Sequence, residues 1–148
     1  MIRAVFRISI FVMLLVYCAS SPHSPRTAGY APNLSVQNDN KKIVEAFRAG
    51  ISGFMVESVG TVEKILPDDL EGSPHQRFIL RLSNGHTLLL VHNIAIAPRV
   101  DTIKEGDTVY FRGQYEWNAK GGVIHWTHHD PNRHKEGGWL EYSGRRYE

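Results

Sequence analysis

The chain has 148 residues, and its hydrophobic and charged fractions of 42% and 22% are ordinary for a soluble globular protein. This length supports one hydrophobic core and excludes two comfortable domains. The formal charge of +2 depends on two of the 17 lysines and arginines, Arg3 and Arg7, and the other 15 balance 15 acidic residues. A protein that coats nucleic acid by bulk charge is therefore excluded, because it would show a basic domain.

Residues 1–20 have the three zones of a secretory signal. Arg3 and Arg7 give a positive start, and the apolar run from Ile8 to Val16 is too short to anchor a helix across a bilayer. We therefore expect an exported bacterial envelope protein, located in the periplasm, on the outer membrane as a lipoprotein, or outside the cell. The mature chain should contain no transmembrane helix.

Cys18 is the only cysteine, and it lies where the apolar run ends. The segment from Leu15 to Cys18 resembles a lipobox, which predicts lipidation of Cys18, although bulky Tyr17 stands where a small residue is usual. Cleavage after Ser20 is the alternative, and it would discard Cys18 with the signal. In both cases the mature protein has no disulfide and depends on its core alone.

Residues 21–38 are rich in Ser, Pro and Asn and lack periodicity, which predicts a flexible tether. Residues 39–148 should form a single domain. It should begin with a short helix over about residues 40–48, because Asp39 or Asn40 can cap a helix there. The apolar stripe of this helix would consist of Ile43, Val44 and Phe47.

The hydrophobic period changes to two after residue 53, which predicts strands. We expect them over residues 54–66, 76–82, 87–94, 108–117 and 123–128. Gly60 inside the first strand suggests a bulge. Asn84-Gly85 and residues 118–122 should form two hairpin loops.

A bent strand, a hairpin, a connection and a second hairpin is the order of an OB-type barrel, with an SH3-like barrel as the main rival. Residues 139–142 and 145–147 should add a small hairpin with its turn at Ser143-Gly144. The expected fold is therefore mainly β: a small five-stranded OB-like barrel with a short N-terminal helix and a C-terminal β-hairpin.

The first hairpin loop predicts a polar cluster. A two-residue loop at Asn84-Gly85 would place Arg77 directly opposite His92. His75 would project to the same side, with Asn93 next in line. These four side chains would then converge at the open end of the hairpin.

The second hairpin predicts another polar face. If Trp117 pairs with Gly122, Gly113 lies opposite Trp126 and makes room for its indole. The reverse face then carries Arg112, Gln114, Glu116, His125 and Thr127, and His128 follows in the loop. Exposed aromatic side chains there could stack on bases or sugars.

Side chains that could bind a metal occur in two loops. The acidic turn 67–72 could offer oxygen ligands to Ca²⁺ or Mg²⁺, and the segment 128–134 contains both histidine and aspartate. The residues concerned are Asp68, Asp69, Glu71, His128, Asp130 and His134. Ordinary solvated loops are the alternative, which we favour for both segments.

The stretch from Gly60 to Tyr147 resembles an uncharacterised bacterial family, the domain of unknown function 3465. Its matching segments include His75–Phe78, His92–Ile94, Ala97–Arg99, His125–His128 and Gly138–Leu140. The resemblance covers most of the mature chain. Because the family has no known activity, it implies domain identity and export and does not suggest a reaction.

Three functions follow from these patterns. The first is a binding module for an anionic ligand such as nucleic acid or another phosphate-bearing molecule, held by Arg77, Arg112 and His125. The second is a metal-dependent phosphodiesterase or nuclease. Arg77 and Arg99 would stabilise phosphoryl charge, and His75 or His92 would activate water. The third is a structural or partner-binding protein of the envelope.

Overall fold

The computed structural model describes residues 38–148, so the predicted signal, Cys18 and nearly all of the predicted tether lie outside the described residues. The described part contains one helix and seven strands. They are α1 (Asn40–Ala49), β1 (Phe54–Asp69), β2 (His75–Leu82), β3 (Thr87–Asn93), β4 (Thr108–Glu116), β5 (Val123–His125), β6 (Trp139–Tyr142) and β7 (Arg145–Tyr147). No helix within residues 38–148 is long and apolar enough to cross a membrane.

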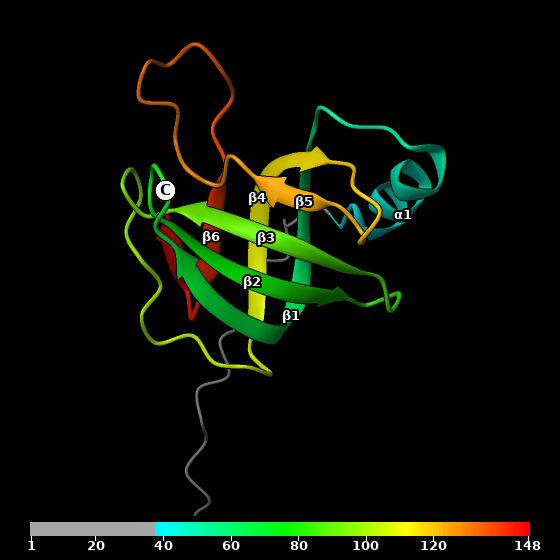
Figure 1. Ribbon diagram of the computed structural model, residues 1–148, viewed down its shortest axis with the longest axis horizontal. Helices are drawn as coiled ribbons and strands as arrows, with labels where there is room; N and C mark the ends of the chain where they lie inside the picture. Colours follow the sequence, from blue (N-terminus) through cyan, green and yellow to red (C-terminus); the bar gives the residue numbers. More distant parts are fainter. Residues whose placement is uncertain (1–37) are drawn as a thin grey trace, which may run out of the picture.

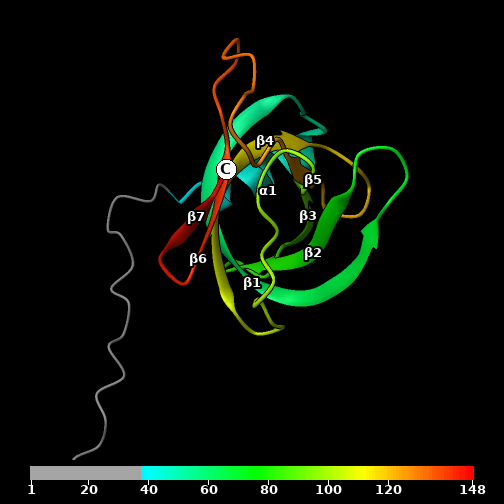
Figure 2. The same ribbon diagram turned by 90° about the vertical axis from the view of Figure 1, so that its left-hand side faces the viewer.

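The strands form one sheet in the order β1-β2-β3-β5-β4-β6-β7, and an additional pairing joins β1 to β4. Five strands therefore close a ring, β1-β2-β3-β5-β4, that returns to β1 (Figures 1 and 2). All pairings are antiparallel except that of β3 with β5. The expected mainly β fold with a short helix is confirmed. The sheet has seven strands rather than five, because the C-terminal hairpin joins it along β4.

β1 is long enough to serve two neighbours. Its first half pairs with β4 and its second half with β2, and Gly60 takes part in both pairings. A Cβ atom at Gly60 would lie 3.3 Å from the carbonyl oxygen of Arg81, so the glycine suits the point where the neighbours crowd the strand. The predicted bulge lies further along, between Val62 and Lys64.

The core fills the inside of the ring, and two segments cover its ends. The ring contributes fully buried side chains such as Phe78, Leu90 and Phe111. Helix α1 lies across one end, where Ile43 joins the same core cluster (Figure 2). The crossover between β3 and β4 covers part of the other end with Val100.

Helix α1 begins and ends as its flanking residues predict, with one difference at the start. The expected capping residue Asp39 makes no side-chain cap, and its carboxylate accepts the amide of Glu57 at 3.0 Å instead. The side chain of Asn38 accepts the amide of Asn40 at 3.1 Å. At the end of the helix, Gly50 adopts a left-handed conformation with φ of 69°.

The C-terminal hairpin forms at the predicted residues. Ser143 and Gly144 both have positive φ, at 49° and 75°, as a two-residue hairpin turn of the primed type requires. Leu140 and Tyr147 pair with each other and belong to the core cluster. This hairpin thus extends the ring's core beyond β4.

Candidate functional site on the outer face of the ring

The tip of the β2–β3 hairpin decides which side chains face each other. The amide of Leu82 donates to the carbonyl of His86 over 2.8 Å, so the loop has three residues, Ser83 to Gly85. The two-residue loop that we predicted is therefore wrong. The extra residue shifts the register by one position, and Arg77 does not lie opposite His92. Because such a shift reverses the faces of a strand, these two side chains point to opposite sides of the sheet.

His92 lies inside the ring opposite Gln76, and its side chain is fully buried. Its Nε2 lies 3.1 Å from the carbonyl oxygen of Pro98, and its Nδ1 lies 2.8 Å from the hydroxyl oxygen of Thr127. Because a carbonyl only accepts, Nε2 carries the proton and Nδ1 accepts from the hydroxyl. Both ring nitrogens are therefore used in structural hydrogen bonds.

Burial lowers the pKa of His92 from 6.5 to about 4, because desolvation disfavours the imidazolium. The hydrogen bond to Pro98 opposes this change, and the nearby His128 and His75 add to it. His92 is therefore neutral near pH 7. A base that activates water must reach that water with a free nitrogen, and His92 offers none.

Gln76 holds the crossover beside His92. Its Nε2 donates to the carbonyl of Val100 and its Oε1 accepts the amide of the same residue, both over 3.0 Å. Together with the bond from His92 to Pro98, this pair keeps the crossover against the end of the ring, where Ala97 is also buried. Gln76 and His92 therefore fix the position of the crossover.

Arg77 and His75 project from the outer face near the open end of the hairpin, where His75 pairs with Asn93. Arg77 donates through Nε and Nη2 to the carbonyl of Pro67, over 3.0 and 2.8 Å. Its Nη1 lies 3.8 Å from a carboxylate oxygen of Asp69. The structure therefore brings His75, Arg77 and Asn93 to one edge of the outer face.

The acidic turn is tied to the crossover. Arg99 forms ion pairs with Asp68 and Asp101, the latter over 3.0 Å between Nε and Oδ1. Asp69 accepts the amide of Glu71 over 3.1 Å. Among residues 38–148, no group of three or more His, Cys, Asp or Glu side chains is arranged to hold a metal ion. The expected role of Arg99 toward a phosphate would require it to leave these carboxylates.

Asp130 organises the loop that follows β5. Its Oδ1 accepts the amide of Asn132 over 3.1 Å, and its Oδ2 accepts the amides of His134 and Lys135 over 2.6 and 2.7 Å. Desolvation raises the pKa of this carboxyl group, but the three amide hydrogen bonds outweigh it and hold the pKa of Asp130 below its usual value. Its oxygens stabilise the loop backbone and are not presented to a metal.

The second hairpin has the predicted register, with Gln114 opposite His125. Arg112, Gln114, Glu116 and His125 therefore share the outer face, as expected. Thr127, which was expected beside them, is instead buried against His92 inside the ring. Arg112 forms an ion pair with Glu136 from the loop after β5. This polar face is thus partly covered by that loop.

Glu116 and His125 lie close together on this face. The hydrogen bond from Gln114 Nε2 to Glu116 lowers the pKa of Glu116; desolvation opposes this, while Ser52 and His125 lower it further. His125 Nε2 lies 3.7 Å from Glu116 Oε1. Within residues 38–148 this buried nitrogen has no hydrogen-bond partner.

Strand β5 ends three residues before its predicted end, because Trp126 has a positive φ of 57° and turns the chain away. Its indole donates to the carbonyl of Glu136 over 3.1 Å, and its ring lies against that of His128 in a tilted arrangement. We expected Gly113 to make room for this indole. A Cβ atom there would instead lie 2.5 Å from the carbonyl oxygen of His125.

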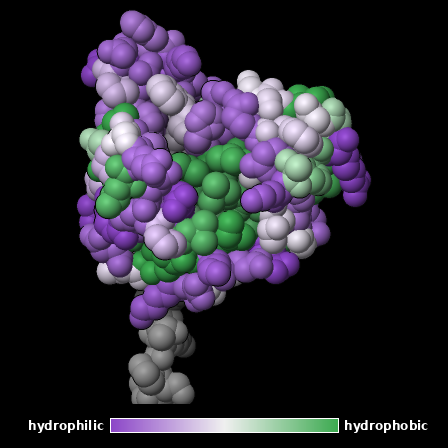
Figure 3. Space-filling view, in the orientation of Figure 1, coloured by the Kyte–Doolittle hydropathy of each residue, from purple (hydrophilic) through white to green (hydrophobic). Residues whose placement is uncertain are grey.

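Sequence reasoning missed a strip of aliphatic side chains on the outer face. The pairings align Ile79 with Leu89 and Leu89 with Val123, and Val91 projects beside them. All four side chains are partly exposed. Figure 3 shows a hydrophobic area on this face, framed by hydrophilic side chains. The unbroken apolar runs of β2 and β3 were the available signal, since a strand with one wet face alternates.

Comparison with known protein families identifies the family of this chain. The family model described as protein of unknown function (DUF3465) matches residues 28–148. The chain belongs to this family. The resemblance inferred from the sequence is confirmed, and the match includes every described residue of the ring and of the C-terminal hairpin. No curated protein matches the chain.

Proposed function

We propose that this protein is a binding module of the bacterial envelope without a catalytic role, and that the outer face of β2, β3 and β5 takes an extended segment of a partner protein. The observation that carries the proposal is the strip of Ile79, Leu89, Val91 and Val123, which lies across three strands on a face turned to solvent. Grouped apolar side chains on a surface are typical of an interaction site.

The strand order supports this choice of face. A five-stranded ring in the order β1-β2-β3-β5-β4 with β3 and β5 parallel fits an OB-type barrel, which is the architecture we propose. OB-type barrels bind their ligands across the face of the second and third strands and through the loops after the first and fourth strands. The aliphatic strip lies on that face.

The margins of the strip indicate the chemistry of the partner. Lys64, Arg77 and Arg81 line it along β1 and β2, and Glu116 lies on the opposite side. Arg81 forms an ion pair with Glu63 over 2.6 Å. A carboxylate of the partner can therefore bind Arg81 only by replacing that of Glu63. A partner segment with aliphatic side chains toward the strip and acidic side chains toward β1 is complementary to this arrangement.

The same face is less suited to nucleic acid. None of the outward side chains of β2, β3 and β5 is Phe, Tyr or Trp, so the face offers no large ring on which bases could stack. The nuclease hypothesis loses support as well, because His92 is neutral and both of its nitrogens are engaged.

A second candidate function, the binding of nucleic acid or another phosphate-bearing ligand, is favoured by the loop after β5. This loop projects from the body of the protein (Figure 1). It exposes His129, Arg133, His134 and Lys135, and Lys135 lies over the ring of Trp126. Cations next to a partly exposed aromatic ring suit a polyanion.

Nuclear magnetic resonance titration of the protein separates these functions. The probes are a peptide of alternating Asp and Val, a matched peptide of alternating Lys and Val, and a thymidine oligonucleotide. We expect the acidic peptide alone to shift the amides of β2, β3 and β5. Val91→Ser should weaken its binding about tenfold, which is a loss of about 1.4 kcal/mol, and Thr87→Ser on the same strand should not.

The outcomes are distinct. Binding of the oligonucleotide that is lost in the Arg133→Gln, Lys135→Gln double variant would support the second function. Equal binding of both peptides, or amide shifts confined to another face, would contradict the proposed surface.

The expected export is part of the proposal. It is supported by the positive start and the short apolar run of the first 20 residues. The intact mass of the protein recovered from cell envelopes tests it. A chain that begins at a lipid-modified Cys18 identifies a lipoprotein, a chain that begins at Ser21 identifies ordinary cleavage, and an uncut chain in the cytoplasm contradicts export.

A further inference from the structure

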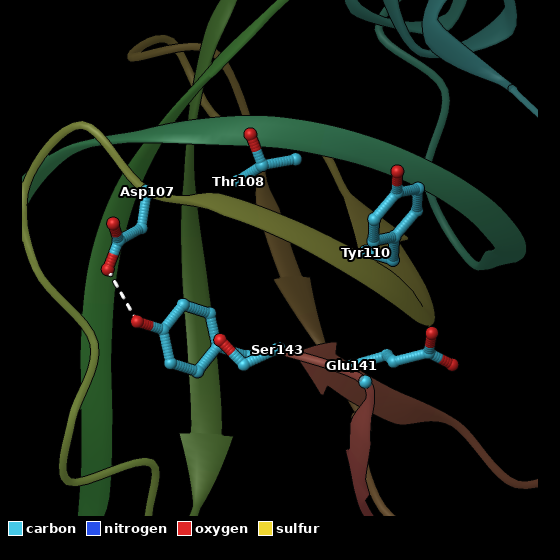
Figure 4. A pocket seen from close by; sticks show the side chains of 7 residues that line it. Asp107, Thr108, Tyr110, Glu141 and Ser143 are labelled. Carbon is cyan, nitrogen blue, oxygen red and sulfur yellow. Dashed lines mark hydrogen bonds between the residues drawn. The ribbon is translucent and has the colours of Figure 1, made fainter. Parts of the chain in front are cut away.

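A hollow of about 350 Å³ lies away from the aliphatic strip, between the start of β4 and the turn of the β6–β7 hairpin. Two tyrosines line it, Tyr110 from β4 and Tyr142 from β6. Asp107, Thr108, Glu141 and Ser143 form the polar part of its wall (Figure 4). Its volume is at the lower end of the range for small-molecule sites.

The carboxylate of Asp107 is held in place at this hollow. Its Oδ2 accepts the hydroxyl of Tyr142 over 2.7 Å and the amide of Lys104 over 2.8 Å, and Figure 4 shows the first of these bonds. The hydrogen bond to Asp107 raises the pKa of Tyr142, so its hydroxyl stays protonated as the donor. The carboxylate is therefore oriented before any ligand arrives.

Asp107 also carries the uncompensated charge of the hollow. Within residues 38–148, no donor bonds its Oδ1, and no lysine or arginine forms an ion pair with it. The other carboxylate in the wall, Glu141, is paired with Arg146 over 3.4 Å. One free carboxylate oxygen thus lies beside Tyr142, and Tyr110 lines the opposite end of the hollow (Figure 4).

We propose that this hollow binds a primary ammonium group carried on a short aliphatic chain. An ammonium has three N–H donors and no acceptor, which suits the free oxygen of Asp107 and the hydroxyl of Ser143 in the same wall. A cation near an aromatic face gains further attraction from the ring of Tyr142. The aliphatic chain would extend along the hollow toward the ring of Tyr110.

Three sources could supply this group: a polyamine, a lysine side chain and an ethanolamine headgroup. The probes are therefore 1,4-diaminobutane, N-acetyl-lysine amide and O-phosphoethanolamine, each titrated into the protein at low salt and followed by amide chemical shifts. We expect shifts at Thr108, Ser143 and Gly144. The probe that binds most tightly identifies the source.

Variants test the geometry. Asp107→Asn keeps an acceptor for Lys104 and Tyr142 but removes the charge, and we expect it to weaken binding at least about tenfold. Tyr110→Leu should weaken it severalfold. Glu105→Gln is the matched control, because it removes one negative charge from the same turn without lining the hollow, and it should leave binding unchanged.

Several results would overturn the site. Equal losses of affinity in Asp107→Asn and Glu105→Gln would mean that the overall negative charge of this region attracts cations without a specific site. Amide shifts confined to other residues would place the binding site elsewhere. Succinate that binds as well as 1,4-diaminobutane would exclude selectivity for a cation. If Asp107→Asn fails to fold, Tyr110→Leu tests the site in its place. An unchanged affinity of Tyr110→Leu for 1,4-diaminobutane would contradict the proposal.

Discussion

His92 Nδ1 lies 2.8 Å from the hydroxyl oxygen of Thr127, and this buried bond joins the end of β3 to the segment after β5. In the neutral imidazole Nδ1 accepts, whereas protonation of His92 would turn Nδ1 into a donor and place a charge inside the ring.

The first prediction is a loss of stability in mild acid. The unfolded chain protonates His92 below about pH 6.5, while the folded protein resists protonation until about pH 4. The unfolded state then binds more protons, so the free energy of unfolding falls as pH decreases between these values, by about 3 kcal/mol in total. Urea unfolding at a series of pH values measures this loss. In His92→Gln this component should vanish, and an unchanged pH dependence in that variant would contradict the assignment.

The second prediction concerns the clamp made by Gln76. Gln76→Leu leaves the amide and carbonyl of Val100 buried without partners, which should cost roughly 3 kcal/mol of unfolding free energy. Hydrogen exchange should also accelerate at the Val100 amide. Gln114→Leu is the control, because Gln114 is half-buried on the outer face, and its cost should stay below about 1 kcal/mol. Similar losses in the two variants would argue against a clamp.

The third prediction separates crowding from backbone strain. A Cβ atom at Gly113 would meet the His125 carbonyl oxygen at 2.5 Å and the Ile124 side chain at 2.7 Å, so Gly113→Ala should destabilise by about 3 kcal/mol. Gly72 has φ of 73° but open space around it, and Gly72→Ala should cost only about 1 kcal/mol. Thermal unfolding compares them, and a reversed order would show that β5 can move aside.

The fourth prediction concerns the loop after β5. Asp130→Ala removes the acceptor of three loop amides, so the loop should open locally while the ring stays folded. Trypsin should then cut faster after Arg133 and Lys135 with little change in Tm. Asp130→Asn keeps one side-chain oxygen, so its rate of cleavage should lie between the rates of Asp130→Ala and of the original protein. Protection equal to that of the original protein would mean that other contacts hold the loop.

The turns show how much of the fold the sequence predicts. The Ser143-Gly144 hairpin was predicted correctly because a two-residue turn leaves little choice of pairing. The Gln114–His125 register was also correct, although its longer loop left the pairing open. Asn84-Gly85 was ambiguous. It suits a two-residue loop, but Gly85 can also be the left-handed third residue of a longer loop, and it has φ of 83° here. Because the loop has one residue more than predicted, His92 lies in the core and not on the surface.

The candidate site was less predictable for the same reason. Ion pairs such as Arg99 with Asp68 join segments 31 positions apart, and no local pattern specifies them. In the sequence, the aliphatic strip shows only as a lack of alternation between apolar and polar residues in β2 and β3. Strands that are covered on both faces show the same pattern, so it does not identify an exposed strip. Sequence patterns therefore located the chemical groups but not their neighbours.

Strand β1 hydrogen-bonds to β2 with one half and to β4 with the other, and the ring closes only where β5 joins β3. A ribosome or a translocation channel delivers these strands in order, so the first half of β1 stays unpaired until β4 arrives some fifty residues later. Until then the nascent chain has open strand edges, which invite pairing with other chains. A chain cut short before residue 123 would keep these edges unpaired, so the segment 123–148 is needed to close the ring.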